Sequence, residues 1–302
     1  MLPRLVALIA LAAVLAGCGF KEEPIGPLPL FPQTARDSLG REVRIDVAPQ
    51  RIVSLDPGMT ATVFALGAGK LVEGRSGRET YPKGALKPPV MITPQGEPDI
   101  KALRRAKPDL ILAPATLVPT KDDANRLALR IGANVYVVRA DSVDGVREDI
   151  LELGLMTGRA ERSREVVAGI DAELTRVRDA VAGLPKVPAF VDAGFRYTIG
   201  PDDLPADLLR LAGGVNVAAD ARRGTQLTVA DLRTAAPEAW ISIKGQGLTP
   251  EELKSNPGLK NLPAVQSGTI SEIDRATLFD DGPRVARSLV LIATAIHPDL
   301  QL

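Results

Sequence analysis

Short apolar runs alternate with amphipathic stretches along most of the chain. The apolar runs have strand length and lie at 51–55, 71–76, 109–114, 134–138, 189–194, 239–243 and 268–273. Segments with helical spacing lie between them, at 59–67, 98–106, 121–131, 202–212, 228–235, 249–254 and 283–296. Strands that alternate with helices form parallel sheets with covered faces. The pattern therefore predicts an α/β fold.

One segment, residues 142–184, departs from this alternation. Apolar residues recur there at steps of three and four, at Val166, Val167, Ile170, Leu174, Val177 and Val181. The spacing predicts one long amphipathic helix over about 160–182, which Gly183 and Pro185 end. At 1.5 Å per residue such a helix is about 34 Å long, the length of a small domain. We therefore expect two α/β lobes joined by one long helix.

The N-terminal 33 residues have a different character. Arg4 and the apolar run "LVALIALAAVL" (5–15) have the size of a secretory signal and are too short for a membrane-spanning helix. The sequence "LAGC" ends at Cys18 and resembles a bacterial lipobox, which implies cleavage before Cys18 and acylation of this cysteine. The alternative is an ordinary signal peptide with an incidental cysteine. Four prolines in 19–33 then predict an extended tether.

These patterns divide the chain into five parts. We expect a signal peptide (1–17), a lipid-anchored linker (18–33), an N-terminal α/β lobe (34–141), a bridging helix (142–184) and a C-terminal α/β lobe (185–302). The N-terminal lobe begins with a small hairpin over 34–47 that turns at Leu39 and Gly40.

Composition and charge exclude several classes of function. The chain has 37 basic and 37 acidic residues, a balance that gives no support for nucleic-acid binding. Cys18 is the only cysteine and His297 the only histidine, so an intramolecular disulfide and a Cys/His zinc site are excluded. A Ser-His-Asp triad would need His297, which lies far from any predicted strand end. We therefore expect a binding protein, with a hydrolase as the less favoured alternative.

Three stretches carry a resemblance to a known family. They are "PQRIVSLDPGMTATVFALGAGKLVEGRS", "PDIKALRRAKPDLILA" and "NPGLKNLPAVQSGTISEID", the last followed by "GPRVARSLVLIATAIHPD". They resemble the periplasmic substrate-binding proteins of ABC importers that carry iron-siderophores, haem and cobalamin. The resemblance covers about residues 34–300. It implies two Rossmann-like lobes with parallel sheets, a rigid bridging helix and a ligand in the cleft between the lobes.

The resemblance and the strand ends together select candidate ligand-binding residues. In open parallel sheets a ligand sits beyond the carboxyl ends of the strands. The candidates there are Asp56, Pro57, Met59, Arg78, Tyr81, Phe195, Tyr197, Arg223 and Phe279. Rings suit a flat macrocycle and arginines suit carboxylates. Tyr81 precedes a proline, as in haem-binding relatives, where such a tyrosine ligates iron. Cobalamin-binding relatives carry the same Tyr-Pro pair. The alternative is that Tyr81 has no role toward a ligand and is a loop tyrosine packed on Pro82.

The permease-docking positions differ from those of the family. Relatives place a glutamate near the start of one helix in each lobe, and these glutamates pair with permease arginines. Here the corresponding positions hold Lys101 and Ala230, with Asp99 and Asp231 close by. Either the permease differs too, or the protein is a binding lipoprotein of the same fold that acts as a store, a sensor or an outer-membrane partner.

The expected function is capture of haem, a ferric siderophore or cobalamin by a monomer that has no cofactor of its own. We expect it in the periplasm or at the cell surface, anchored through Cys18, with an ABC permease as partner. Gly19 permits export to the outer membrane, so the sequence leaves the choice of membrane open.

Overall fold

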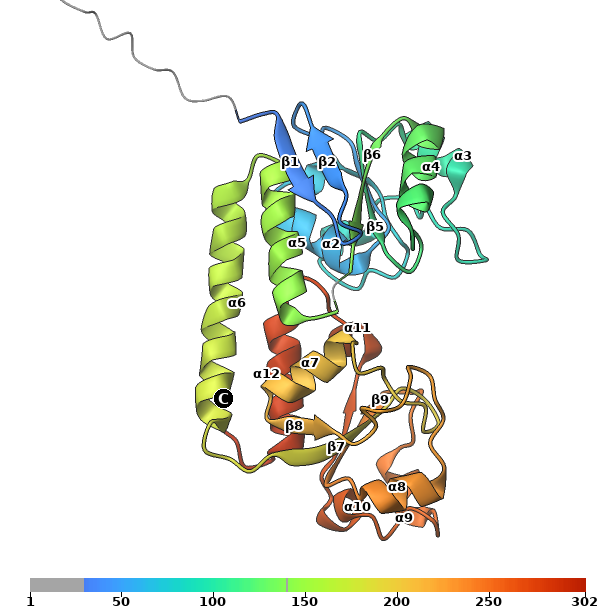
Figure 1. Ribbon diagram of the computed structural model, residues 1–302, viewed down its shortest axis with the longest axis vertical. Helices are drawn as coiled ribbons and strands as arrows, with labels where there is room; N and C mark the ends of the chain where they lie inside the picture. The colour runs from blue at the N-terminus through green and yellow to red at the C-terminus, as the bar shows by residue number, and fades with distance from the viewer. Residues whose placement is uncertain (1–29, 140) are drawn as a thin grey trace, which may run out of the picture. The chain divides into compact units, whose positions relative to one another are not determined.

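The computed structural model describes residues 30–139 and 141–302 (Figure 1). The signal peptide, Cys18 and most of the expected linker lie outside the described residues. Residues 31–302 form one compact unit, so the boundaries that we expected between lobes stay a prediction. Among the described residues, no helix has the length and apolar character needed to cross a bilayer.

The N-terminal lobe contains a hairpin and a four-stranded parallel sheet. The hairpin pairs β1 (Gln33–Arg36) with β2 (Glu42–Ile45), and Gly40 at its turn has φ +70°. The sheet has the order β4-β3-β5-β6, formed by β3 (Ile52–Ser54), β4 (Val72–Gly74), β5 (Leu110–Pro114) and β6 (Asn134–Val138). Its helices are α2 (Pro57–Ala65), α3 (Ile100–Ala106) and α4 (Lys121–Ile131), with 3₁₀ turns at Gly69–Leu71 and Lys83–Leu86.

The C-terminal lobe repeats this topology. Its strands are β7 (Val187–Asp192), β8 (Gly214–Asn216), β9 (Ala239–Ile243) and β10 (Ile270–Ile273), in the parallel order β8-β7-β9-β10. In both sheets the first strand in sequence lies between the second and the third. The helices of this lobe are α7 (Leu204–Leu211), α8 (Val229–Ala235), α9 (Pro250–Ser255), α10 (Pro263–Ser267), α11 (Arg275–Leu278) and α12 (Val285–Ile296).

The long helix expected over about 160–182 is present, and a second helix that was not predicted lies beside it within residues 142–184. The long helix α6 (Ala160–Val181) forms nearly where the spacing predicted it, and α5 (Val143–Met156) precedes it. The two helices run side by side, with the longer α6 extending past both lobes and α5 beside the N-terminal lobe (Figure 1). Their close approach depends on small residues, because a Cβ on Gly154 would collide with Ser163. The sequence prediction missed α5 because its apolar positions are spread around most of the helix.

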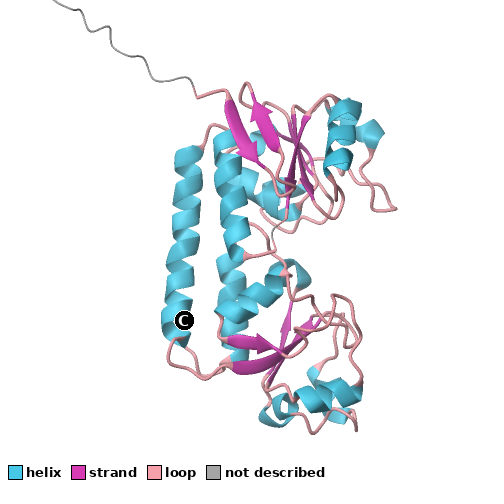
Figure 2. Cartoon of the chain, viewed as in Figure 1, coloured by secondary structure: helices cyan, strands magenta, loops and turns pink. Residues whose placement is uncertain are grey.

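The two helices lie beside the lobes (Figure 2) and contribute side chains to the hydrophobic cores of both. Ile170, Val177 and Val181 of α6 are buried with strands β7 and β9 and with α12. Leu153 and Met156 of α5 are buried instead with β3, β5 and the hairpin of the N-terminal lobe. The parallel two-sheet α/β class predicted from the apolar runs is therefore confirmed. Five short elements went unpredicted, namely β8, α10, α11 and the 3₁₀ turns at Gly69–Leu71 and Lys83–Leu86.

Asp149 is a buried carboxyl group on α5, between the helix pair and the N-terminal sheet. The Tyr136 hydroxyl donates a hydrogen bond to its Oδ1 atom at 3.0 Å. Burial, together with the negative charges of Asp56 and Glu148, raises the pKa of Asp149 to about 7. Because the pKa of Asp149 is higher in the folded chain than its unfolded value near 3.8, protonated Asp149 stabilises the folded state. This contribution to the unfolding free energy is complete below about pH 3.8 and is lost as the pH rises through about 7.

We therefore expect Asp149→Asn to stabilise the protein at high pH. The amide keeps an acceptor for Tyr136 and carries no charge, so the unfolding free energy at about pH 8 should rise by roughly 2 kcal/mol. Urea unfolding at several pH values measures this, and the fall in stability between acid and neutral pH should flatten. Glu148→Gln, on the exposed face beside Asp149, is the control and should keep most of the wild-type slope. Equal slopes for wild type and Asp149→Asn would contradict the prediction.

Candidate functional site

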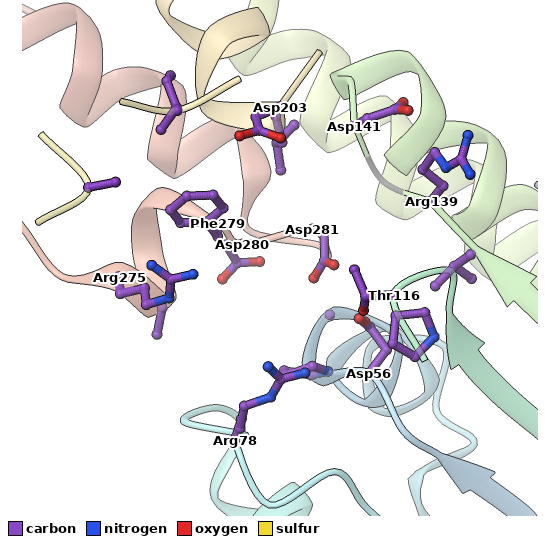
Figure 3. A pocket seen from close by; sticks show the side chains of 18 of the residues that line it. Asp56, Arg78, Thr116, Arg139, Asp141, Asp203, Arg275, Phe279, Asp280 and Asp281 are labelled. Carbon is purple, nitrogen blue, oxygen red and sulfur yellow. The ribbon is translucent and has the colours of Figure 1, made fainter. Parts of the chain in front are cut away.

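A cavity of about 980 Å³ lies at the carboxyl ends of strands from both sheets (Figure 3). The N-terminal lobe lines it with the loops after β3, β4, β5 and β6. The C-terminal lobe contributes the loop after β7, the start of α7 and the segment around α11. The volume is at the upper end of the usual range for small-molecule sites, about 300–1,000 Å³. Loops from both lobes thus face one shared space.

Seven of the nine expected ligand-binding residues line this cavity. They are Asp56, Pro57, Arg78, Tyr81, Tyr197, Arg223 and Phe279. The structure places their side chains around the same space, whereas their roles toward a ligand stay a prediction. Met59 and Phe195 are not among the lining residues.

Local backbone geometry explains the different placement of Met59 and Phe195. Met59 lies in the first turn of α2, which directs its side chain into the core of the N-terminal lobe, where it is fully buried. Phe195 lies in a turn where it and Arg196 both have positive φ, 47° and 69°. This left-handed turn leaves Phe195 65% exposed outside the cavity. The strand-end rule locates a loop and does not give the direction of each side chain within it.

Buried carboxylates hold the loops of the N-terminal lobe. Asp56 begins α2 and accepts a hydrogen bond from the Met59 N–H at 2.8 Å. Glu79 accepts hydrogen bonds from the backbone and hydroxyl of Ser76, both at 2.8 Å, and pairs with Arg75 at 3.1 Å. Burial tends to raise the pKa of Glu79, but these donors hold it below its usual value. Arg75 therefore braces the loop that presents Arg78 and Tyr81.

Asp192 has the same role in the C-terminal lobe. Its Oδ1 atom accepts hydrogen bonds from the N–H groups of Gly194 at 3.0 Å and Arg196 at 2.8 Å, and its Oδ2 atom accepts one from Leu248 at 2.9 Å. Burial raises the pKa of Asp192 and the three N–H donors oppose that rise. One carboxylate thus fixes two loops, and one of them carries Tyr197.

The arginines of the cavity differ in how far they are engaged. Arg223 pairs with Asp203 at 2.7 Å. Arg284 pairs with Asp280 at 2.8 Å, and its guanidinium lies 4.2 Å from the centroid of the Tyr81 ring. Arg275 lies 4.7 Å from the centroid of the Phe279 ring. In contrast, Arg78 and Arg139 form no ion pair with another described residue. These two are free to meet an anionic group.

Family membership follows from comparison with known proteins. Residues 52–277 match the model of the family described as "Periplasmic binding protein". The chain belongs to this family. An uncharacterised ABC transporter substrate-binding lipoprotein, YvrC of Bacillus subtilis, is 26% identical over 97% of this chain and 96% of its own length. The family confirms the resemblance and the expectation of a binding protein rather than an enzyme.

Two further relatives show the range of the similarity. A cobalamin-binding protein of Halobacterium salinarum is 26% identical over 88% of this chain and 74% of its own length. Among solved structures, the periplasmic haem-binding protein RhuT of Roseiflexus superposes with a TM-score of 0.70 at 22% identity, covering 83% of this chain and 99% of RhuT. The structural likeness supports the two-lobe fold of this periplasmic binding protein.

The expected permease-docking positions lie on α3 and α8. Lys101 and Ala230 are both exposed. Asp99 caps α3 by accepting hydrogen bonds from the N–H groups of Lys101 and Ala102, at 2.9 and 3.0 Å. Asp231 closes the capping box of α8, since its Oδ2 atom accepts hydrogen bonds from Thr228. Both carboxylates are therefore engaged at their own helix ends.

Several residues of the cavity were missed by the sequence reasoning. They are Arg139 and Asp141 after β6, and Asp203, Asp280 and Asp281 in the C-terminal lobe. The strand at 134–138 was predicted, so the same strand-end rule would have found Arg139 and Asp141. Among the described residues, no group of three His, Cys, Asp or Glu side chains is placed to hold a metal ion.

We expect Asp192→Ala to loosen both loops that this carboxylate holds. Three backbone N–H groups would lose their acceptor, which should lower the unfolding free energy by roughly 3 kcal/mol. Hydrogen exchange should accelerate at the amides of Gly194, Arg196 and Leu248 beyond the change in global stability. Asp220→Ala, an exposed aspartate of the same lobe, is the control. Unchanged protection of these three amides would show that Asp192 does not order the loops.

Proposed function

We propose that this periplasmic binding protein captures a metal chelate in its inter-lobe cavity and delivers it to an ABC importer. The cavity of about 980 Å³ between the lobes carries this proposal, because it offers space for a bulky ligand at the strand ends. Haem, a ferric siderophore and cobalamin are the ligand classes proposed. Acylation of Cys18 would anchor the protein outside the cytoplasm, with residues 19–33 as a tether.

The lining of the cavity supports a ligand that has both flat apolar and anionic parts. Tyr81, Tyr197 and Phe279 provide rings on which a macrocycle can stack. Arg78 and Arg139 provide guanidinium groups for carboxylates on the ligand. Two of the relatives described above are named as cobalamin-binding and haem-binding proteins, and these ligands have the flat and anionic parts that the cavity suits.

The ligand would enter a cleft that is largely preformed. Helices α5 and α6 pack into the cores of the two lobes, so large changes in the relation between the lobes would break buried contacts. We therefore infer modest lobe motion on binding. The protein itself would contribute stacking, charge pairing and exclusion of water, and it needs no cofactor of its own.

The capping of α3 and α8 favours a second candidate function. Asp99 and Asp231 are engaged as caps and Lys101 is exposed, so the docking surface lacks the free glutamates of importer relatives. A ligand store, a sensor or an outer-membrane partner needs no such docking. Uptake of labelled chelate by cells lacking the protein separates the two, because loss of an importer component abolishes uptake and loss of a store leaves it intact.

We expect haemin to bind with a shifted Soret band if haem is the ligand. Purified protein is titrated separately with haemin and with cyanocobalamin, and absorption spectra are recorded. Tyr81→Phe retains the ring that stacks on Arg284 but removes the phenol oxygen, so it should abolish an iron–phenolate spectrum and weaken binding at least about tenfold, which is about 1.4 kcal/mol.

Tyr197→Phe is the matched control, since it removes a hydroxyl from the opposite lobe and should leave the Soret position unchanged. A spectral response to cyanocobalamin alone would identify a corrinoid ligand instead. If neither compound changes its spectrum or is retained by the protein, haem and cobalamin are excluded and ferric siderophores are tested next.

A further inference from the structure

The segment 280–284 of the C-terminal lobe meets the N-terminal lobe at three points. Gly282 lies against Gly58 at the start of α2, Asp281 faces Asp56, and the Arg284 guanidinium covers the Tyr81 ring at 4.2 Å. We call this segment the clasp. It lies on the wall of the cavity and connects the lobes separately from the helix pair α5 and α6.

The clasp contact is too close for side chains at its centre. A Cβ on Gly282 would lie 2.8 Å from the Gly58 carbonyl oxygen and 3.0 Å from its Cα atom. A Cβ on Gly58 would lie 2.6 Å from the carbonyl carbon of Asp281. Since real Cβ atoms do not approach backbone so closely, the two glycines permit this contact. The backbones of the two lobes therefore touch directly here.

This approach brings two carboxyl groups together. Asp56 and Asp281 come from opposite lobes (Figure 3), and the Asp281 carboxyl group lies against Gly58, where an added Cβ would fall 2.1 Å from its Oδ1 atom, two residues from Asp56. Two adjacent carboxylates repel each other, and a hydrogen bond between them requires one to be protonated. Burial and then the charge of Asp56 raise the pKa of Asp281 well above its ordinary value. The pair is therefore most stable with one shared proton.

No nearby cation in the described part of the chain is placed to neutralise the Asp56–Asp281 pair in place of the shared proton. Arg284 is paired with Asp280, and Glu79 behind α2 is paired with Arg75. Asp280 adds negative charge near Asp281, and Asp149 on α5 adds negative charge near Asp56 once the pH exceeds its pKa of about 7. Arg78 lowers the pKa of Asp56 through its charge, but it forms no ion pair within 4.0 Å with Asp56. The net surroundings thus favour the protonated pair.

We propose that Asp56 and Asp281 are positioning residues that share one proton across the lobes, and that release of this proton to solvent opens the clasp and widens the cavity. The step breaks one O–H bond and leaves two facing carboxylates, which repel. It requires no ligand and no partner, so it can be tested independently of the proposed function. The cavity is then closed at low pH and opens as the pH rises.

The test measures the distance between the lobes in the ligand-free protein. Spin labels are attached at Leu129→Cys on α4 and Ser255→Cys on α9, both exposed, in the full chain carrying Cys18→Ser. Pulsed electron paramagnetic resonance gives the distance distribution at steps from about pH 5 to about pH 9. Arginine side chains stay protonated throughout this range, so their charge does not change during the titration. The distribution should shift to longer distances as the pH rises.

Two variants give opposite expected results. Asp281→Asn keeps a hydrogen-bond donor toward Asp56 without a titrating proton, so the short distance should persist at every pH. Gly282→Ala pushes the backbones apart, so the long distance should appear at every pH. Asp274→Asn, an exposed aspartate seven positions away that does not line the cavity, is the charge-matched control and should keep the wild-type profile.

A wild-type distribution that does not change with pH would overturn the proposal, as would an Asp281→Asn profile equal to that of the wild type. A short distance in Gly282→Ala would also overturn it, because the clasp would then not set the lobe spacing. If circular dichroism shows that Asp281→Asn is unfolded, Asp56→Asn replaces it with the same expected result.

Discussion

The embedding of one helix pair in two hydrophobic cores is the constraint on which the rest of the structure depends. Ile170, Val177 and Val181 of α6 are buried in the C-terminal lobe, while Leu153 and Met156 of α5 are buried in the N-terminal lobe. Val166 packs against both cores. Rotation of one lobe against the other would expose these side chains at about 1.5–3 kcal/mol each. The relation between the sheets, and with it the cavity, is therefore held by packing.

Because the packed helix pair limits the motion of the lobes, small contacts on the other side of the cavity can decide how far the cavity opens. The bridge limits the lobes to modest motion, so the free-energy difference between a closed and a slightly wider cavity is small. The clasp adds a backbone contact, a carboxyl pair and a guanidinium stacked on a ring, all outside the bridge. Contacts of about 1 kcal/mol each suffice to bias such an equilibrium, because 1.4 kcal/mol is a factor of ten in population.

Sequence patterns predicted the fold well because apolar runs of strand length and helical periods are local signals. Strands such as 134–138 and 239–243 were predicted at their observed bounds, whereas β8 (Gly214–Asn216) has Val215 as its only branched apolar residue and carries too little apolar pattern. The site was predicted only to the level of loops. Met59 lies in the first turn of a helix and Phe195 in a left-handed turn, and hydrophobic periodicity does not give the direction of either side chain. The pairing of Asp56 with Asp281 arises from tertiary contact alone.

The two lobes share a topology, yet they use the aspartate at the carboxyl end of their first strand differently. Asp192 ends β7 and is satisfied by three N–H groups of its own lobe. Asp56 follows β3 and accepts one hydrogen bond from the Met59 N–H. The rest of its carboxyl group faces Asp281 of the other lobe. A carboxylate saturated by local donors fixes the loops of its own lobe. A carboxylate left partly unsatisfied at an interface must find a proton or a partner there, and the glycines at 58 and 282 bring Asp281 within its reach.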